Sequence, residues 1–415
     1  MTIQLSFLNE LKERGFIYQT TNLEGLSQAF RAEISPSIYI GFDCTARSLH
    51  VGNLMQIMLL RLMQKYSIKP IVIIGGATSK IGDPSGRDTE REILSEEMIQ
   101  KNLAGVQHSL EKFLNFGSGE EDALLLNNEM WLNNLKYIDL LRDYGSIFSI
   151  NKMVSFEKIK LRLQQEKNLS FLEFNYLILQ SYDYLHLAQN YNCILQFGGS
   201  DQWGNIVSGV DLVKKVMNKE VFGITTPLIT TAAGVKMGKS QAGALWLNGD
   251  LLSPYDYYQF WRNTDDRDVF RFMRIYTDLT LDEIKQYEND GEKNINEFKK
   301  ILGYEATKLC HGEKNAKLAL DAADKMFEQG DATQLPEFFV SKEKIEAGIC
   351  IYELLKESGL VSSNGEAKRL IKGGGARLNK TPVTDENHKP TLEDFSNNHA
   401  ILSSGKKKHI RLTLK

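Results

Sequence analysis

The sequence predicts an α/β protein in which a parallel-sheet domain is followed by an α-helical domain and a small α+β module. Short apolar runs at 37–42, 69–76 and 192–199 indicate the sheet, since each ends in glycine and polar turn residues. Helical stretches such as 54–66 lie between them, and this alternation is typical of a parallel sheet. Ligands bind such sheets at the carboxyl ends of the strands, where the three glycine turns fall.

The later segments lose the strand pattern and become helical. Ser253 is a favourable N-cap and Pro254 suits the first helical position, so we expect a helix to begin there. Charged helical segments follow, and then a stretch with little periodicity that indicates a linker. The expected organisation is a first domain at 1–250 with a helical insertion at about 115–190, a helical domain at 251–330, a linker at 331–347 and a final module at 348–415.

Composition excludes several classes of protein. The 415 residues are 42% hydrophobic and 25% charged, as in globular proteins with several domains. No run approaches the roughly 20 apolar residues that span a bilayer, and the opening residues lack the pattern of an export signal, so we expect a cytoplasmic protein. The cysteines are scattered, which indicates free thiols and no metal site; they are Cys44, Cys193, Cys310 and Cys350.

Charge is distributed unevenly along the chain. From Glu366 to Lys415 there are eleven basic and five acidic residues, a net +6, which leaves −9 for the rest of a chain whose total is −3. A basic tail on an acidic body is consistent with contact to nucleic acid, although such a run is more often a solvated surface.

The first two glycine turns carry polar residues at the ends of strands. The first contains His50 and Asn53, three residues apart before an apolar helix. In the second, adjacent glycines allow a ligand to approach the backbone, and Asp83 follows in a Gly-Asp-Pro turn. Taken alone, this second turn slightly favours an ordinary connection between a strand and a helix over a binding loop.

The segment at 171–189 predicts a largely buried helix with a polar stripe. Tyr176, Gln180 and Asp183 stand at i, i+4 and i+7, so they share one face. Buried polar groups need partners. The stripe is therefore either part of a structural hydrogen-bond network or the wall of a pocket that binds a polar small molecule.

Two further stretches suggest binding of a nucleotide. Asp201 and Gln202 follow the third strand, where such acceptors suit ribose hydroxyls or an ammonium group. Lys236 and Lys239 lie in a loop rich in glycine, alanine and serine. Two mobile ammonium groups fit stabilisation of a polyphosphate leaving group.

Together these motifs resemble the bacterial-type tyrosyl-tRNA synthetases, which are class I aminoacyl-tRNA synthetases with a Rossmann-like catalytic domain. HVGN at 50–53 stands where the family has HIGH, and KMGKS at 236–240 where it has KMSKS. The stretches YIGFD, GDPSG, FNYLILQSYD and GGSDQWGN also correspond in order. The resemblance implies a homodimeric tyrosine–tRNA ligase that uses L-tyrosine, ATP with Mg2+ and tRNA(Tyr), with the insertion at the dimer interface.

The resemblance also implies roles for individual residues. Tyr39 and Asp183 would contact the phenolic hydroxyl of tyrosine, and Asp201 would hold the ribose of ATP. The tyrosine site would comprise Tyr39, Asp43, Asp83, Tyr176, Gln180, Asp183 and Gln202. The ATP site would comprise Gly41, Asp43, His50, Gly52, Asn53, Asp201, Lys236 and Lys239. The catalytic groups, which stabilise the transferring phosphate, would be Thr45, His50, Asn53, Arg87, Arg91, Lys236 and Lys239.

Four positions depart from the family pattern. Asn53 replaces the second histidine of HIGH and cannot carry charge, and Gly238 replaces the serine of KMSKS. Cys44 replaces the usual proline of the first turn, and Arg87 stands where lysine is common. None of these changes removes a group that the chemistry requires.

The last segment resembles the alpha-L RNA-binding module that also occurs in a small-subunit ribosomal protein. The resemblance implies that its basic residues contact tRNA phosphates and that the helical domain reads the anticodon region. The basic residues are Lys368, Arg369, Lys372, Arg377, Lys406, Lys407 and Lys408.

Two other interpretations remain open from the sequence. Tryptophanyl-tRNA synthetases share the fold, although Tyr39 with Asp183 and the appended module favour tyrosine. A non-catalytic RNA-binding protein with a synthetase body is the second. Such a protein should have lost its phosphate-binding lysines or its Asp/Gln cluster, and all of them are present.

Overall fold

The computed structural model describes residues 3–32, 36–84, 94–240, 243–290, 294–328, 335–379, 381–396, 398–405 and 408–415. The chain forms two compact units. The first contains Met1–Leu252 and Asp265–Phe298, and the second contains Ser253–Thr264 and Lys299–Lys415. No helix in the described part of the chain is both long and apolar enough to span a membrane.

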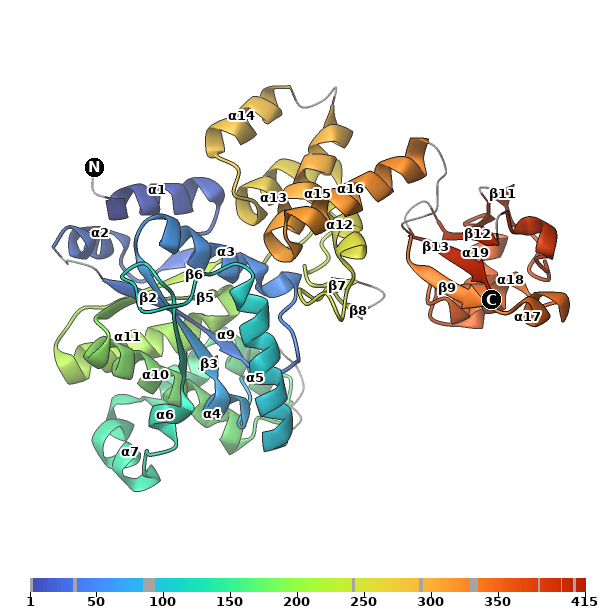
Figure 1. The fold of residues 1–415 in the computed structure, drawn as a ribbon. Coiled ribbons are helices and arrows are strands. Elements are labelled where there is room, and N and C mark those ends of the chain that lie inside the picture. Colours follow the sequence, from blue (N-terminus) through green and yellow to red (C-terminus); the bar gives the residue numbers. More distant parts are fainter. Residues whose placement is uncertain are drawn as a thin grey trace. The chain divides into compact units, whose positions relative to one another are not determined.

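A six-stranded sheet forms the centre of the first unit (Figure 1). Its order is β1-β6-β5-β2-β3-β4, and every neighbouring pair is parallel except β1 with β6. The predicted parallel sheet is thus confirmed. The strands are β1 (Gln19–Thr20), β2 (Ser37–Asp43), β3 (Lys69–Gly75), β4 (Leu124–Asn127), β5 (Cys193–Gly199) and β6 (Phe222–Thr226).

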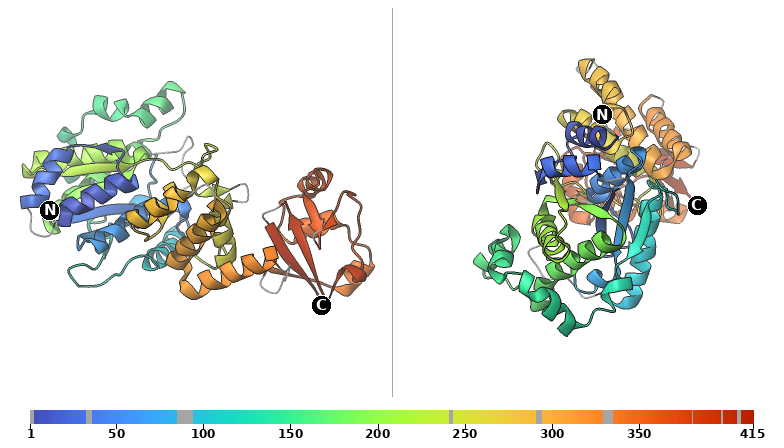
Figure 2. Two further views of the ribbon diagram at one scale, coloured as in Figure 1. Left: turned by 90° about the horizontal axis from the view of Figure 1, so that it is seen from above. Right: turned by 90° about the vertical axis from the view of Figure 1, so that its left-hand side faces the viewer.

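The helices of the first unit cover both faces of this sheet. The crossovers through α3 and α11 run in opposite directions from the centre of the sheet, so right-handed connections place these helices on opposite faces (Figure 2). The helices are α1 (Ile3–Arg14), α2 (Leu23–Ala32), α3 (Val51–Lys65), α4 (Gly76–Ser79), α5 (Glu96–Glu111), α6 (Glu129–Leu132), α7 (Tyr137–Tyr144), α8 (Ile150–Ser155), α9 (Glu157–Gln164), α10 (Phe171–Asn190), α11 (Trp203–Met217), α13 (Val269–Tyr276) and α14 (Leu281–Asn289). Short 3-10 turns are η1 (Gly145–Ile147), η2 (Ser200–Gln202) and η3 (Asp266–Asp268), and a small hairpin joins β7 (Lys239–Ser240) to β8 (Gly243–Ala244).

The topology creates a crevice between β2 and β5. From β2 the chain proceeds to β3 and β4 on one side, whereas from β5 it proceeds to β6 on the other. Loops leaving the carboxyl ends of β2 and β5 therefore diverge, which is the arrangement that opens a ligand site in parallel sheets.

The second unit contains three helices followed by a small sheet module. The helices are α12 (Pro254–Arg262), α15 (Ile295–His311), whose residues up to Phe298 are counted with the first unit, and α16 (Glu313–Glu328). Ser253 caps α12 as expected, since its side chain accepts a hydrogen bond from the amide of Asp256 and Pro254 is the first helical residue. However, α13 and α14 pack with the first unit, although the sequence placed them in the helical domain at 251–330.

The C-terminal module combines a five-stranded sheet of order β11-β10-β12-β13-β9 with three helices. Its elements are β9 (Glu337–Val340), α17 (Lys342–Glu346), α18 (Ile351–Glu357), α19 (Asn364–Lys372), β10 (Ala376–Leu378), β11 (Thr381–Pro382), η4 (Leu392–Asp394), β12 (His399–Ser404) and β13 (Lys408–Leu414). The expected linker at 331–347 is therefore corrected, because β9 pairs with β13 and Val340 and Ile345 join the buried core.

One strand lies inside the expected helical insertion at about 115–190. β4 pairs in parallel with β3 at the edge of the sheet, and the chain becomes helical only after it. Leucine-rich strands of four residues carry little periodicity, so pairing with β3 rather than local preference determines this element.

Candidate functional site

A cavity of about 410 Å3 opens at the carboxyl ends of β2 and β5. Fourteen of the site residues predicted from the sequence line it, which brings together segments from five parts of the chain. They are Tyr39, Gly41, Asp43, Thr45, His50, Gly52, Asn53, Asp83, Tyr176, Gln180, Asp183, Asp201, Gln202 and Lys236. Arg87 and Arg91 lie outside the described residues, as does the side chain of Lys239.

One end of the cavity has a buried carboxylate beside a buried phenol. Asp183 of α10 is 4% exposed and Tyr39 of β2 is 1% exposed. The indole Nε1–H of Trp131 donates to Asp183 Oδ1 at 2.7 Å, and Asn128 Nδ2 donates to Oδ2 at 3.1 Å. The hydroxyl of Tyr39 makes no hydrogen bond to any described residue. Because a buried hydroxyl without a partner is costly, this end is suited to a polar ligand group.

The environment of these two groups shifts both of their pKa values upward. Burial raises the pKa of Asp183 to about 7, the charge of Asp43 acts in the same direction, and the bonds from Trp131 and Asn128 oppose the shift. Burial, followed by the charge of Asp183, also raises the pKa of Tyr39. A further hydrogen-bond donor at Asp183 would favour its ionised form and lower this pKa.

This shift predicts a pH-dependent difference in stability between the protein and Asp183→Asn. A raised carboxyl pKa means that the folded state retains its proton above pH 4, so the contribution of Asp183 is lost as the pH rises towards 7. The parent should therefore lose stability between pH 5 and 7.5, whereas Asp183→Asn has no titrating group at this position. The unfolding free energy of Asp183→Asn relative to that of the parent should rise by at most about 1.4 kcal/mol per pH unit over this range and be constant above it. Urea unfolding without ligands measures it, and a pH-independent difference would contradict the assignment.

The polar stripe of α10 bonds to carboxylates and amides from other elements. Tyr176 donates to Asp43 Oδ2 at 3.1 Å, and Thr78 donates to Asp43 Oδ1 at 3.0 Å. The pKa of Tyr176 is raised by burial and then by the nearby charges of Asp43 and Asp83. Two carboxylates at one wall of the cavity create a negative potential that suits a cationic group.

Amide side chains continue this wall. Gln202 Nε2 donates to Asp83 Oδ2 at 2.7 Å, while Asn205 Nδ2 donates at 3.0 Å to the Oε1 atoms of both Gln180 and Gln202. The stripe is therefore both a hydrogen-bond network and the lining of the cavity, so the two interpretations open from the sequence are compatible.

The start of α3 forms the opposite end of the cavity. His50 is its N-cap: His50 Nδ1 accepts from the amide of Gly52 at 3.0 Å, and Asn53 Oδ1 accepts from the amide of His50 at 3.2 Å. A neutral histidine that accepts at Nδ1 carries its proton on Nε2. The spacing of the two residues therefore has a structural reason, since each caps the first turn of a helix whose N-terminus favours anions.

The loop that carries Lys236 lies against this helix start. Met237 N donates to Ile229 O at 2.9 Å, and Leu245 N donates to Gly238 O at 3.2 Å. Gly238 has φ +95°, and a Cβ there would lie 2.7 Å from the amide nitrogen of Gly52. Glycine in place of the serine of KMSKS is thus required in this conformation, because a side chain would separate the loop from α3.

Several residues of the site were not anticipated from the sequence. Asn128 and Trp131 hold Asp183, Thr78 holds Asp43, and Asn205 joins the two glutamines. The first two follow β4, whose carboxyl end lies at the same edge of the sheet as those of β2 and β3. An apolar run ending in Asn-Asn, three residues before a tryptophan, was the available signal.

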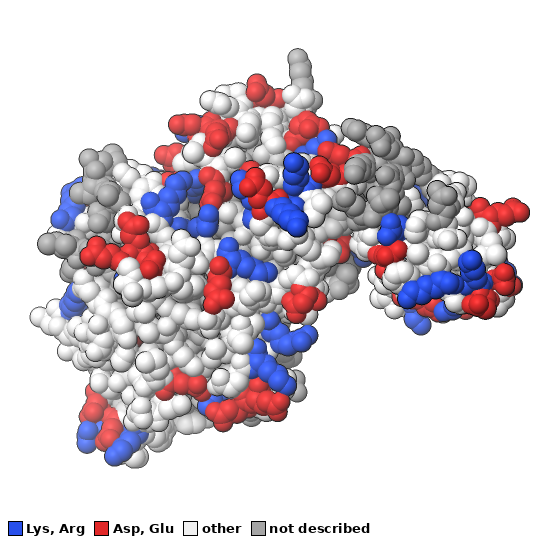
Figure 3. All heavy atoms as spheres, in the orientation of Figure 1, with Lys and Arg blue, Asp and Glu red and all other residues white. Residues whose placement is uncertain are grey.

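The basic residues predicted to contact RNA lie on several elements of the C-terminal module. Lys368, Arg369 and Lys372 are on α19, Arg377 is on β10 and Lys408 begins β13, whereas Lys406 and Lys407 are outside the described residues. The ammonium of Lys368 lies 4.7 Å from the centre of the Tyr352 ring, and Lys372 pairs with Glu386 at 3.3 Å. Basic and acidic side chains alternate on the face of the module visible in Figure 3.

Comparison with known proteins relates the chain to one enzyme family. The model of the class I tRNA synthetases for tryptophan and tyrosine matches residues 32–328. The chain is 53% identical over 408 residues to tyrosine–tRNA ligases of Rickettsia felis and Rickettsia prowazekii, in alignments that cover 98% of this chain and 99% of each relative.

Solved structures show the same fold. A C-terminally truncated mitochondrial tyrosyl-tRNA synthetase of Aspergillus nidulans matches with a TM-score of 0.69 and 30% identity, covering 77% of this chain and 94% of its own. A tryptophanyl-tRNA synthetase of Encephalitozoon cuniculi matches with a TM-score of 0.56 and 11% identity, covering 77% and 90%. The second likeness concerns the fold alone, so it does not bear on the choice of amino acid.

Proposed function

This chain belongs to the bacterial-type tyrosyl-tRNA synthetases of class I, and from that premise we propose how its cavity carries out the reaction. The protein is an aminoacyl-tRNA ligase that joins L-tyrosine to ATP, giving tyrosyl-adenylate and pyrophosphate. It then transfers the tyrosyl group to the 3′ end of tRNA(Tyr). The proposal assigns each end of the cavity to one substrate.

The observation that carries the assignment is the pair of Tyr39 and Asp183 at the closed end of the cavity. The carboxylate of Asp183 would accept the phenolic hydrogen of the substrate, and Tyr39 would gain the partner that its hydroxyl lacks among the described residues. Phenylalanine would leave the hydroxyl of Tyr39 without a partner and would give Asp183 no donor beyond Trp131 and Asn128. A buried unpaired group carries its full cost of desolvation. This end therefore selects tyrosine.

The amino acid's other groups would bind along the wall. Asp83, Tyr176 and Gln180 would hold the α-ammonium group, with Asp43 adding negative charge, and Gln202 would lie near the carboxylate. The hydrogen-bonded chain of these side chains supports this assignment, because it fixes them before the substrate arrives.

ATP would occupy the end of the cavity at α3. Asp201 would bind its ribose, and the phosphates would lie between the start of α3 and the lysine loop. The lining residues in this region are Gly41, Thr45, His50, Gly52, Asn53 and Lys236. Lys239, Arg87 and Arg91 would add positive charge, and Mg2+ would enter as part of the ATP complex, bound by its phosphates.

The chemistry requires no covalent enzyme intermediate. A carboxylate oxygen of tyrosine attacks the α-phosphorus of ATP, a new P–O bond forms, and the bond to pyrophosphate breaks with its electrons leaving on the pyrophosphate. Since the carboxylate is already a nucleophile, the protein supplies position and positive charge. In the second step the ribose hydroxyl of tRNA attacks the carbonyl and AMP leaves.

Tyrosine-dependent exchange of pyrophosphate into ATP tests the proposal without tRNA. We expect exchange with tyrosine and none above background with phenylalanine or tryptophan at equal concentration. The phenylalanine arm tests the phenol pair, and the tryptophan arm tests the size of the closed end. Exchange with tryptophan, or none with tyrosine in folded protein, would overturn the proposal.

The remaining domains would bind tRNA. Among the helices of 251–330, those of the second unit, α12, α15 and α16, would contact the anticodon region. In the C-terminal module, α19, β10 and the start of β13 would contact phosphates through Lys368, Arg369, Lys372, Arg377 and Lys406–Lys408. Phosphate contacts position a nucleic acid and weaken with salt. The site of action would be the cytoplasm, where translation takes place.

A homodimer is proposed from the exposed apolar surface of α6–α10. Met130, Tyr137, Ile138, Ile150 and Phe171 are each at least 52% exposed. A second copy would cover such a patch. Ile138→Glu, at 72% exposure in the parent, should shift the protein towards monomer in sedimentation equilibrium, whereas Val216→Glu on α11 should not. A parent protein that is itself monomeric would exclude the dimer.

A further inference from the structure

The loop that carries Lys236 is fastened by two residues outside the cavity. Ala232 N donates to Asp268 Oδ2 at 2.6 Å, and an Nη atom of Arg271 donates at 2.5 Å both to Thr230 O and to Asp268 Oδ1. The side chain of Asp268 is 4% exposed and that of Arg271 is 42% exposed, so these are partly buried charge-assisted bonds. We call Asp268 and Arg271 the clasp.

Asp268 stands at a helix N-cap, a position whose side chain normally caps the amides of the helix that it begins. It is the N-cap residue of α13, yet its side chain makes no capping bond to α13. An aspartate at an N-cap usually accepts from the second or third amide of the helix that it begins. Here one carboxylate oxygen accepts from the backbone of the lysine loop, and the other accepts from the side chain of Arg271 within α13.

Fixing Thr230 also fixes Lys236. These two residues form an antiparallel bridge, and the neighbouring bond from Met237 N to Ile229 O is 2.9 Å. The turn between the two arms is closed by bonds from Thr231 N to Val235 O and from Gly234 N to Thr231 O, each 2.8 Å. The clasp thus holds the outer arm and the turn of a hairpin whose inner arm carries Lys236.

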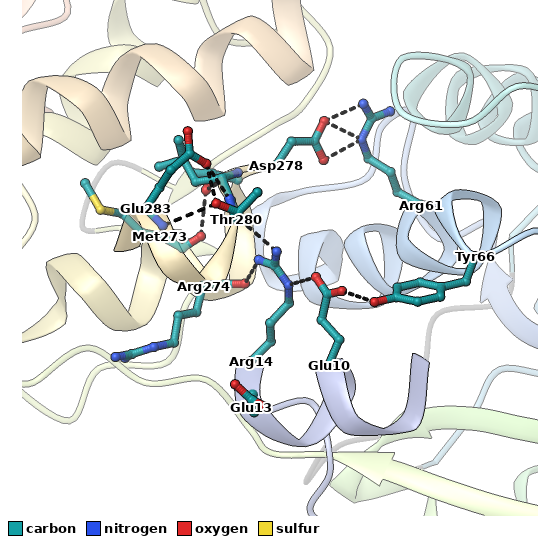
Figure 4. A network of polar contacts seen from close by, with 12 residues as sticks. Glu10, Glu13, Arg14, Arg61, Tyr66, Met273, Arg274, Asp278, Thr280 and Glu283 are labelled. Carbon is teal, nitrogen blue, oxygen red and sulfur yellow. Dashed lines mark hydrogen bonds and ion pairs between the residues drawn. The ribbon is translucent and has the colours of Figure 1, made fainter. Parts of the chain in front are cut away.

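The opposite end of α13 is attached to α1 and α3 (Figure 4). Arg14 of α1 donates at 2.8 Å to Arg274 O and to Leu279 O, and Arg61 of α3 binds both carboxylate oxygens of Asp278. Within α1, Arg14 pairs with Glu10 at 2.6 Å, and Tyr66 donates to the same carboxylate. α3 begins at the cavity, so α13 is connected both to this helix and to the lysine loop.

We propose that Asp268 and Arg271 are positioning residues for activation of the amino acid: they hold the lysine loop in register with the start of α3. The inference rests on the proposed role of Lys236 in the phosphate end of the cavity. Without the clasp the hairpin would populate further conformations. The apparent affinity for the transition state would then fall in proportion to the fraction of molecules whose loop still places Lys236 at the phosphate end. Tyrosine binds at the other end and should be unaffected.

Three variants of the full-length protein test this inference. Asp268→Asn removes the charge and one of the two acceptor oxygens, and Arg271→Met removes the donor. Arg274→Met is the matched control, since Arg274 lies three residues along α13 and its side chain pairs with Glu288 instead of the loop. Melting temperatures establish that each variant is folded. If Asp268→Asn does not fold, Arg271→Met carries the test.

The expected result is a change confined to the ATP half of the reaction. Both clasp variants should lower kcat/KM for ATP in pyrophosphate exchange by about 10- to 100-fold. Their dissociation constants for tyrosine should stay within about twofold of the parent's value, because the loop at the phosphate end does not contact the bound amino acid. Arg274→Met should match the parent in both measurements.

Hydrogen exchange at the backbone amides of 230–237 gives a readout independent of activity. Exchange should accelerate in both clasp variants and not in Arg274→Met, since the amide of Ala232 is a clasp donor. In a Lys236→Ala background, Arg271→Met should lower kcat/KM for ATP much less than it does in the parent. The reason is that substitutions of residues that act as a unit do not have additive effects.

Each outcome has one meaning. Faster loop exchange with unchanged ATP kinetics would overturn the inference, as would equal losses in the clasp variants and Arg274→Met. Absence of tyrosine-dependent exchange in the parent protein would instead refute the proposed function, and the hydrogen-exchange result would still show whether Asp268 and Arg271 restrain the loop.

Discussion

Replacing Asp183 by alanine should weaken tyrosine binding by roughly 10- to 150-fold, the worth of a hydrogen bond to a charged group, and leave ATP binding nearly unchanged. The carboxylate lies at the closed end of the cavity, whereas the phosphate end is formed by α3 and the lysine loop. Equilibrium titration of the variant with tyrosine and with ATP separately measures the difference.

Phenylalanine provides the internal control for this variant. It has no hydroxyl to donate, so its affinity should change far less than that of tyrosine when Asp183 is removed. Asp183→Asn keeps the shape of the side chain and separates loss of charge from loss of volume. Equal losses for tyrosine and ATP would show instead that the substitution disturbs the whole cavity.

Lys236→Ala should lower the rate constant of tyrosine activation by about 100- to 1,000-fold, with small effects on the equilibrium binding of either substrate. Negative charge on the departing pyrophosphate grows in the transition state, so a positioned ammonium group lowers the barrier more than it strengthens the ground state. Single-turnover formation of tyrosyl-adenylate measures this rate constant.

An exposed lysine outside the cavity is the control for general charge. Lys214→Ala on α11 removes the same charge from the surface and should react at the parent rate. A loss of ATP affinity as large as the loss of rate in Lys236→Ala would contradict the expected mechanism, because it would mean uniform binding of ground state and transition state.

The parts of the fold that the sequence predicted are those in which local preference and tertiary position agree. β2, β3 and β5 are apolar runs that end in glycine turns, and α10 has a capping box formed by Ser170 and Glu173. These elements carry most of the proposed tyrosine site. Their strand ends and helix face can be placed from periodicity alone.

Other parts depend on contacts that no local pattern specifies. β4 is four residues long and forms a strand because it pairs with β3. The hydrogen bonds from Asn128 and Trp131 to Asp183 could therefore not be predicted from the sequence. β9 has only one buried residue, Val340, and becomes a strand by pairing with β13. The expected linker failed for this reason: an edge strand with exposed side chains has the composition of a connection.

The bonds of Asp268 and Arg271 to the loop illustrate the same limit for the site. The two residues lie more than thirty positions after Ala232 and Thr230, and nothing in their spacing relates them to the lysines. Only the packing of α13 against the first unit brings them to the loop. Candidate residues chosen from sequence motifs therefore include the groups that face the cavity and omit those that hold them.

The contact between Gly52 and Gly238 determines how the enzyme can be altered. Backbone meets backbone there, and an added methyl group at 238 would lie 2.7 Å from a main-chain nitrogen. Enzyme engineers who wish to change substrate range can vary the large side chains around the cavity, since volume lost in one can be recovered in another. No substitution of a neighbouring residue can make room for a side chain at the two glycines, because some of the atoms in the way of each belong to the backbone. A variant library should therefore keep both glycines and vary other positions.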